Sequence, residues 1–287
     1  MEMSHLSDKS NNFRSLMEIV NKDFLILFVC RLISKPVNKL YLFILKQMLH
    51  QIKTTDDGSH TLFVPELNEH YHSVNGAIQE SYHIFINAGF EYYLNNSYKE
   101  NPQPVQTINI LEIGFGTGLN ALLTLIESEM RSIKVFYNSI ELYPVPIEKA
   151  EKLNFPSLLN KNHLHQKEDI TDFFLQLHTA KWEKAVDITS NFTLFKQQID
   201  FSNPSQFNTD KLFNIVYFDA FAPEKQPEMW TNDVFNKIFS LCDSGAVLTT
   251  YCAKGVVRRM LQNEGFQMER LPGPPGKREV LRGVKSV

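Results

Sequence analysis

An α/β fold with a mostly parallel sheet of seven strands, covered by helices on both faces, is predicted from three features of this sequence. Apolar strands alternate with amphipathic helices from residue 107 onwards. A glycine-rich segment directly follows the first of these strands, and three later strands end on or beside a carboxylate. Such alternation favours a parallel sheet, whose ligands bind beyond the carboxyl ends of its strands.

The individual elements follow from periodicity and from turn residues. We expect strands over 107–113, 134–142, 192–200, 212–220 and 245–252, helices over 118–130, 145–154, 229–242 and 255–265, and two closing strands. The stretch that follows the second helix, up to residue 185, is less regular and is assigned to no element.

Residues 49–100 are expected to add an N-terminal hairpin and helix to the domain formed by 101–287. The hairpin is predicted by Asp57-Gly58, a dipeptide favoured in tight turns between strands. The helix is predicted by apolar residues at helical spacing, with Gly89 as its stop. A polar, proline-containing link over 96–106 follows.

The first 48 residues differ from the rest and are expected to form a poorly ordered or helical extension. The apolar run 24–30 is far shorter than the ~18–20 residues that a membrane span needs, and no small-x-small cleavage site follows it. Met48 is a candidate for the true start. These observations favour a cytoplasmic protein that does not contact a membrane.

Charge and composition exclude several classes of protein. The 287 residues carry a net charge of −3 and 43% hydrophobic residues, which argues against a DNA-coating protein. Charge is uneven, because residues 254–287 hold eight Lys or Arg against three Glu. A basic end on an acidic body is compatible with docking a polyanion, or with an ordinary solvated surface.

Cysteine and histidine usage gives no sign of a disulfide framework or of a metal site. The cysteines, Cys30, Cys242 and Cys252, are odd in number and form no Cys-x-x-Cys pair. His70 and His72 alternate along an expected strand, but no third ligand is clustered with them. We therefore expect no metal.

The segment LEIGFGTGLN points to a nucleotide-like cofactor. Gly114, Gly116 and Gly118 lie between a strand and a helix, where glycine permits close approach and the helix N-terminus supplies N–H donors. The dinucleotide fingerprint is Gly-x-Gly-x-x-Gly, whereas the third glycine comes one position earlier here. This spacing, preceded by Glu112, is typical of S-adenosylmethionine (SAM) methyltransferases.

Two further carboxylates are candidates for the same cofactor. Glu141 ends the next strand, where it could accept both ribose hydroxyls, unless it is an ordinary loop acid. Asp200 ends the third strand, near the expected adenine amino group. Asp169 competes for that role, and the sequence leaves the choice open, although a strand runs straight into Asp200.

The segment FDAFAPEKQPEMW, residues 218–230, takes the sequence beyond a generic methyltransferase. Together with DGSHTLF, EHYHS, GAIQES, GFGTGLN, KGVVRRMLQNEGF and GPPGKREVLRG, in this order, it resembles the methyltransferase domain of the MnmC family over about residues 51–285. The MnmC enzymes complete 5-methylaminomethyl-2-thiouridine at the wobble position of tRNA. The resemblance implies a Rossmann-like SAM-dependent methyltransferase domain over 101–287.

The resemblance also has departures. The chain ends at Val287, without the flavin-dependent oxidoreductase half of MnmC. This implies a stand-alone form that methylates 5-aminomethyluridine, with or without 2-thiolation. The pair Pro274-Pro275 departs from the Gly-x-Gly ending of the family, which leaves the shape of that loop open.

Roles for particular residues combine this resemblance with chemistry. Asp219 is expected to hold the substrate amine and to take its proton, because a carboxylate at a strand end beside the methyl donor can do both. The other catalytic candidates are Lys277 and Arg278, which could clamp the anticodon phosphates or the nucleotide, or could remain exposed and do neither; Glu279 could support them. The predicted cofactor-binding residues are Glu112, Gly114, Gly116, Gly118, Asn120, Glu141 and Asp200.

The predicted substrate-binding residues are Phe221, Trp230, Tyr71 and Ser73. The two residues of the FDAFAPEKQPEMW segment, Phe221 and Trp230, could stack on a flipped-out uracil or could pack in the core. The expected partner is the anticodon loop of tRNA, with no DNA. Which tRNAs are used and the oligomeric state are left open.

Three other functions compete with this hypothesis. A SAM-dependent methyltransferase of a small-molecule amine would use the same Asp219 and the same glycine segment. A nucleotide-binding oxidoreductase would bind NADH instead of SAM. A non-catalytic SAM-binding adaptor would not depend on Asp219.

Overall fold

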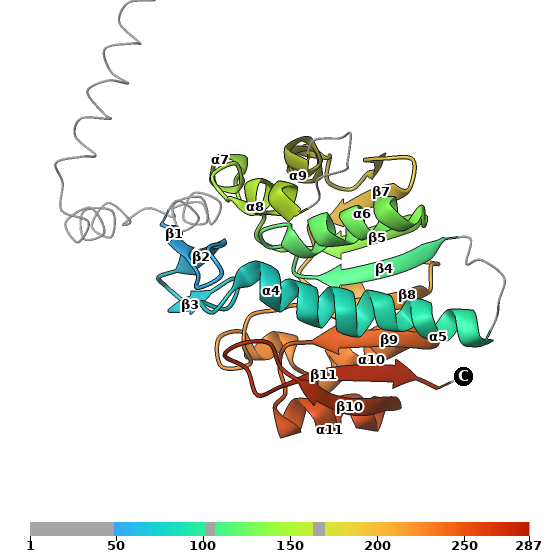
Figure 1. The fold of residues 1–287 in the computed structure, drawn as a ribbon. Coiled ribbons are helices and arrows are strands. Elements are labelled where there is room, and N and C mark those ends of the chain that lie inside the picture. Colours follow the sequence, from blue (N-terminus) through green and yellow to red (C-terminus); the bar gives the residue numbers. More distant parts are fainter. Residues whose placement is uncertain (1–48, 101–106, 163–169, 287) are drawn as a thin grey trace, which may run out of the picture. The chain divides into compact units, whose positions relative to one another are not determined.

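An eight-stranded sheet forms the centre of the part of the chain that the structure describes, residues 49–100, 107–162 and 170–286 (Figure 1). The structure is a computed structural model. The extension 1–48, with the Met48 start, and Asp169 lie outside the described residues.

The middle of the sheet is parallel. Its strands are β7 (Phe192–Gln197), β5 (Val135–Ile140), β4 (Ile108–Ile113), β8 (Phe213–Phe218) and β9 (Cys242–Thr250), in this spatial order. Antiparallel pairs complete the two edges, with β6 (Ala185–Asp187) beside β7 and β11 (Glu279–Lys285) between β9 and β10 (Phe266–Pro272). The predicted α/β fold with a mostly parallel sheet is confirmed.

The strand count differs from the prediction by one, the short edge strand β6. Its three residues are half-buried or exposed, so they carry no run of apolar residues that a sequence could reveal. The central strands were predictable because both of their faces are covered, which requires an apolar residue at nearly every position.

Helices cover both faces of the sheet. The first face carries a continuous helical run, α4 (Ala77–Ser81), η1 (Tyr82–Glu91) and α5 (Tyr92–Glu100), together with α6 (Leu119–Arg131), α8 (Phe155–Asn162) and α9 (Ile170–Thr179). The second face carries α10 (Asn232–Leu241) and α11 (Gly255–Glu264). Short turns of helix, α7 (Ile147–Ala150), η2 (Pro204–Gln206) and η3 (Pro227–Met229), lie in connections.

Alternate side chains of each central strand feed two hydrophobic clusters. In β4, Ile108 and Ile110 pack in the cluster under η1 and α6, whereas Leu111 and Ile113 pack in the cluster under α10. This alternation follows from the period of two in a strand. It also determines the face on which each polar side chain of the strand is buried.

The N-terminal addition is a small antiparallel sheet. The predicted hairpin, β1 (Gln51–Thr54) and β2 (His60–Val64), is joined by a third strand, β3 (Glu69–His70). The Asp57 carboxylate accepts hydrogen bonds from Ser59 N (2.9 Å) and from Gln79 N (3.1 Å) in α4. Burial alone would raise the pKa of Asp57, but these hydrogen bonds prevail and lower it. A charged Asp57 therefore ties the hairpin to the helix.

Two expectations about helices are wrong. The stretch between α7 and β6, which was assigned to no element, contains α8 and α9. Gly89 does not end its helix, because Phe90, Tyr93 and Leu94 continue the buried face into α5, which reaches into the expected link. The glycine serves packing instead: a Cβ at Gly89 would lie 3.2 Å from the Tyr217 ring and 3.3 Å from Thr249.

We expect Gly89→Leu to destabilise the protein by about 2–3 kcal/mol, because the new side chain would push η1 away from β8 and β9. Urea unfolding measures the change. Asn87→Leu is the matched control, because Asn87 is exposed on the same helix and should change stability by less than about 0.5 kcal/mol. Equal effects of the two substitutions would contradict this account of Gly89.

Candidate active site

The predicted site residues gather where the chain reverses its direction of progress across the sheet. From β4 the chain proceeds to β5 and β7 on one side, and it then returns to add β8 on the other side of β4. The loops after β4 and β8 are therefore neighbours at the carboxyl edge. Open α/β sheets bind their ligands at such a point.

Gly114 and Asp219 meet across this point. The Asp219 N–H donates to the carbonyl oxygen of Ile113 (3.0 Å), which continues the pairing of β4 and β8 by one residue. A Cβ at Gly114 would lie 2.5 Å from the backbone oxygen of Asp219, and its φ of 99° is in the left-handed region. Glycine is therefore required here, and it brings the glycine loop (residues 114–118) against the Asp219 backbone.

Glu141 braces the glycine loop from the end of β5. Its carboxylate accepts hydrogen bonds from the backbone N–H groups of Gly116 (2.9 Å) and Tyr143 (2.8 Å). A carboxylate has about four acceptor positions, so it retains capacity for hydroxyl groups of a ligand. Burial raises the pKa of Glu141, although the two amides oppose this rise.

A second brace comes from two histidines that the sequence analysis did not assign to the site. His72 Nε2 lies 2.6 Å from Thr117 Oγ1, and His178 Nε2 lies 3.1 Å from the Thr117 carbonyl oxygen. Burial lowers the pKa of each ring to about 4, so both are neutral at pH 7. Histidine in EHYHS was considered only as a metal ligand; its partner is 45 positions away, which no local pattern reveals.

The Asp219 side chain is half-buried beside α6. Its Oδ2 accepts a hydrogen bond from Asn120 Nδ2 (2.9 Å) in the first turn of α6. Burial raises the pKa of Asp219 to about 7; the Asn120 hydrogen bond and Lys277 act against this rise, and the Glu80 carboxylate adds to it. Asp219 is thus a carboxyl group that can exchange a proton near neutral pH.

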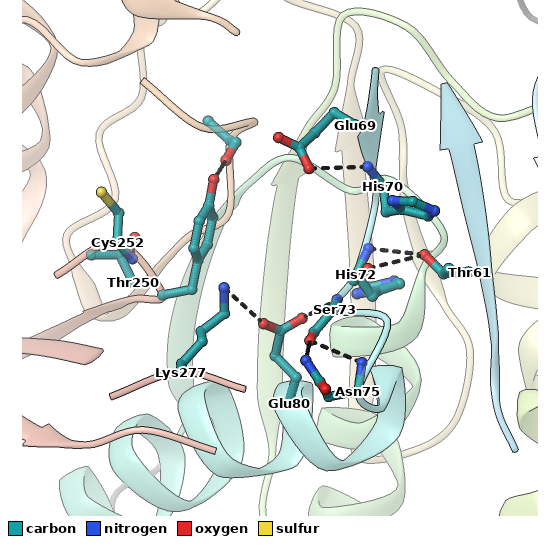
Figure 2. A network of polar contacts seen from close by, with 12 residues as sticks. Thr61, Glu69, His70, His72, Ser73, Asn75, Glu80, Thr250, Cys252 and Lys277 are labelled. Carbon is teal, nitrogen blue, oxygen red and sulfur yellow. Dashed lines mark hydrogen bonds and ion pairs between the residues drawn. The ribbon is translucent and has the colours of Figure 1, made fainter. Parts of the chain in front are cut away.

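Lys277 is half-buried, and its ammonium group points to Glu80 (Figure 2). Its Nζ forms an ion pair with Glu80 Oε1 (3.3 Å) and lies 4.8 Å from the centre of the Tyr251 ring. The other oxygen of Glu80 accepts a hydrogen bond from Ser73 N (2.7 Å). An ammonium group is therefore held here by a carboxylate and an aromatic face. Glu80 and Tyr251 were not predicted, because only the tertiary fold brings them to Lys277.

Tyr71, Phe221 and Trp230 lie at different depths. The rings of Tyr71 and Phe221 are both partly exposed and meet edge to face, with centroids 5.1 Å apart. Trp230 is only 6% exposed; it packs on Phe218 and donates its Nε1–H to the Phe221 carbonyl oxygen (2.8 Å). The indole thereby supports the turn that carries Phe221. Stacking of Phe221 or of Trp230 on a base stays a prediction.

The remaining candidates make no hydrogen bond to Asp219 that the structure shows among its described residues. We expected a strand to run directly into Asp200, but β7 ends three residues before it. Asp200 Oδ1 accepts a hydrogen bond from Ser202 N (3.0 Å). Its contact with adenine stays a prediction. Arg278 is exposed, and Glu279 pairs with Arg270 (3.3 Å) on the neighbouring strand. The cofactor role of Glu112, which is fully buried, also stays a prediction.

Two further observations concern the described residues alone. None of their helices is both long enough and apolar enough to span a membrane. Their His, Cys, Asp and Glu side chains form no group of three that could hold a metal ion.

Comparison with known proteins agrees with this geometry. Residues 166–286 match the model of a family described as S-adenosyl-L-methionine-dependent methyltransferase. The chain is 30% identical over 236 residues to the tRNA 5-methylaminomethyl-2-thiouridine biosynthesis bifunctional protein MnmC of Burkholderia multivorans, covering 79% of this chain and 34% of that protein. It is 30% identical over 234 residues to MnmC of Cupriavidus metallidurans, covering 79% and 32%.

A solved structure shares the fold. The crystal structure of MNMC2 from Aquifex aeolicus superposes with a TM-score of 0.63 at 23% identity, covering 91% of this chain and 82% of that one. The chain spans about a third of the length of the curated relatives it matches.

The fold, the glycine loop with its braces and the family model define the class of protein: a Rossmann-like, SAM-dependent methyltransferase. Within this class, the chain is similar to MnmC over most of its length, which confirms the predicted resemblance. The predicted cofactor, SAM, is confirmed by the family model. The Glu141 carboxylate fits SAM, because it keeps acceptor positions for the ribose hydroxyls beyond the two amides that it binds.

We expect Gly114→Ala to weaken SAM binding about tenfold or more, because a methyl group would separate the glycine loop from the Asp219 backbone. Isothermal titration calorimetry measures the affinity. Gly58→Ala is the matched control: its φ of 82° is also unfavourable for alanine, but no atom lies within 4 Å of the added Cβ. Its cost should be confined to about 1 kcal/mol of stability. Unchanged SAM affinity in Gly114→Ala would contradict the role of this contact.

Proposed function

We propose that this protein transfers a methyl group from SAM to the primary amine of 5-aminomethyluridine, with or without 2-thiolation, at the wobble position of tRNA. The product is 5-methylaminomethyluridine or its 2-thio form. The observation that carries the proposal is the Asp219 carboxyl group, which lies beside the glycine loop with one oxygen held by Asn120. The names of the curated relatives support the choice of substrate.

The chemistry requires a neutral amine. An alkylamine has a pKa near 10, as lysine does, so removing its proton at pH 7 costs on the order of 4 kcal/mol. Asp219 can accept a hydrogen bond from the ammonium group and take the proton, which leaves the nitrogen lone pair available. In the overall reaction an N–CH₃ bond replaces one N–H bond while the S–CH₃ bond of SAM breaks, with its electron pair left on the sulfur of S-adenosylhomocysteine, and the proton leaves through Asp219 to solvent.

The surroundings of Asp219 suit a cation. In the structure the ammonium group of Lys277 lies between Glu80 and the ring of Tyr251. The ammonium of a substrate carries the same charge and similar dimensions, so it would find the same carboxylate and aromatic face. Lys277 would then be released from Glu80 and could reach a phosphate of the tRNA.

Cofactor binding falls to residues of the carboxyl edge. The glycine loop, Glu141 and, as a further candidate, Asp200 would hold SAM, which supplies an activated methyl group when it is bound. Orientation of the nucleotide falls to Tyr71 and Phe221, whose rings form a partly exposed edge-to-face pair at the same edge. A wobble base must leave the anticodon stack to reach such a site.

The partner in this proposal is the anticodon loop of tRNA, and the place of action is the cytoplasm. The basic residues 254–287 support a polyanionic partner over a small-molecule amine, since Arg278 is exposed next to Lys277. A small-molecule methyltransferase would not need this positive charge.

The direct test is incubation of the purified protein with SAM and with tRNA that carries 5-aminomethyluridine. Nucleoside mass spectrometry should detect the methylaminomethyl product. tRNA with unmodified uridine is the control substrate and should gain no methyl group. Methylation of free amines, with none of the tRNA, would refute the proposed substrate and favour the small-molecule alternative.

We expect the methylation rate at limiting substrate to rise with pH through about 7, because Asp219 is protonated and inactive below its pKa of about 7 and ionised above it. Asp219→Asn cannot take a proton and should lower the rate at least about 100-fold. Initial rates between pH 5.5 and 8.5 measure both effects. A rate independent of pH, or an active Asp219→Asn variant, would rule out Asp219 as the base.

We expect Arg278→Ala to weaken tRNA binding and to reduce the slope of log affinity against log salt by about 0.7–0.9, as for the loss of one phosphate contact. Titration of labelled tRNA at several salt concentrations measures the slope. Lys134→Ala is the matched control, because Lys134 is an exposed cation just before β5, at the opposite edge of the sheet. A slope that changes equally in both variants would show that the contact is not local.

A further inference from the structure

A buried polar cluster lies behind Asp219 and plays no part in the reaction described so far. Its centre is Glu112 on β4, which is fully buried. Glu112 Oε2 accepts a hydrogen bond from Ser139 Oγ (2.6 Å) on the neighbouring strand β5. Glu112 Oε1, Asn120 Oδ1 and Tyr137 Oη are buried without a well-formed hydrogen bond. Unpartnered polar atoms are costly in a protein interior, so three in one place call for a physical explanation.

These three groups adjoin one another. The side chains of Asn120 and Tyr137 both lie within hydrogen-bonding reach of the Glu112 carboxyl group. At its other end, the Asn120 amide is bound to Asp219. An ionised Asp219 can only accept hydrogen bonds, so Asn120 must present its nitrogen to it, and Asn120 Oδ1 remains as an acceptor.

Counting donors distinguishes the two protonation states of Glu112. If Glu112 is ionised, the Tyr137 hydroxyl is the one O–H donor for two acceptors, Glu112 Oε1 and Asn120 Oδ1, since Asn120 Nδ2 donates to Asp219. If Glu112 is protonated, its own O–H is a second donor, and small side-chain adjustments satisfy all three groups. The charged groups favour the second state as well, because the charge that acts on Glu112 is the negative charge of Asp219.

We propose that Glu112 is a neutral carboxylic acid at neutral pH and a positioning residue for Asp219. Its O–H donates to Asn120 Oδ1, which fixes the Asn120 amide with Nδ2 donating to Asp219 Oδ2. The second oxygen of Asp219 is thereby left for the substrate amine. The inference rests on the proposed role of Asp219 as the base. It differs from the prediction that Glu112 binds the cofactor.

The titration behaviour is consistent with this assignment. Burial raises the pKa of Glu112 to about 8, the Ser139 hydrogen bond acts against the rise, and Asp219 adds to it. A carboxylic acid in this position adds no second negative charge beside the catalytic carboxylate. The arrangement thus lets one buried acid orient another without mutual repulsion.

Substitution of Glu112 tests the inference. Glu112→Ala removes the donor to Asn120, and we expect the rate at saturating substrate to fall about tenfold or more. Glu112→Gln keeps a neutral side chain that can donate to Asn120 and accept from Ser139, so it should restore most of the loss. In the same variant the dissociation constant of SAM should stay within about twofold of wild type. A SAM dissociation constant at least about tenfold higher in Glu112→Gln would overturn the proposal and support an ionised, cofactor-binding Glu112.

A second measurement does not depend on activity. A folded-state pKa above that of the unfolded chain means that the folded protein binds the additional proton, so stability falls as pH rises between about 5 and 8. Glutamine does not titrate, so the melting temperature of Glu112→Gln minus that of wild type should increase over this window and then level off. The other titratable groups that face Glu112 are Asp219, Tyr137 and Tyr217, and both proteins share them.

A melting-temperature difference that is independent of pH would show that Glu112 is ionised and would overturn the proposal. If wild-type protein methylates no tRNA amine but this difference increases with pH, the proposed function fails while the protonated state of Glu112 stands. The two failures are therefore distinguishable.

Discussion

The close approach of β4 and β8 at their carboxyl ends is the constraint on which the site depends. Asp219 extends the pairing by one hydrogen bond to Ile113, and Gly114 has no side chain to separate the two backbones. One contact thus places a carboxyl group next to the glycine loop. The braces from Glu141 and from His178 have a similar effect, because they attach the loop to β5 and to α9. The relative position of Asp219 and the glycine loop is therefore determined first by backbone geometry and second by side chains.

The fold was predictable where burial produces a recognisable pattern of apolar residues in the sequence. The central strands are covered on both faces and read as apolar runs, and β8 ends at Phe218, directly before Asp219. Prediction was wrong where a residue has two physical uses. Gly89 resembles a helix stop, yet it allows a continuous helix to lie against Tyr217 and Thr249. The helices α8 and α9 were missed because Pro156 stands near the start of α8 and because two histidines and three charged residues interrupt the apolar pattern between the two helices.

The sequence predicted those parts of the site that form local patterns, but not the pairs formed by residues far apart in the chain. The glycine spacing and the strand-end acid are local patterns with a physical reason, so the sequence alone could locate them. Asn120 came only from the family resemblance, and its hydrogen bond to Asp219 gives it a physical role. Glu80, Tyr251 and His72 act through partners that lie far away in the sequence, and no local pattern reveals such pairs. Lys277 was expected to face phosphate, whereas the structure pairs it with Glu80.

The balance of charge around Asp219 connects these observations. Three carboxyl groups, those of Asp219, Glu80 and Glu112, lie around the first turns of α4 and α6, and Lys277 is the cation that acts on Asp219. A site with three ionised acids and one lysine would carry excess negative charge in partly buried surroundings, which is costly. If Glu112 is neutral, one negative charge remains on Glu80, paired with Lys277, and one on Asp219. In the proposed reaction a substrate ammonium takes the place of Lys277 beside Glu80, and the ionised Asp219 takes its proton. Asp219 and the amine are then both neutral, and the one negative charge left among these three carboxyl groups is that of Glu80.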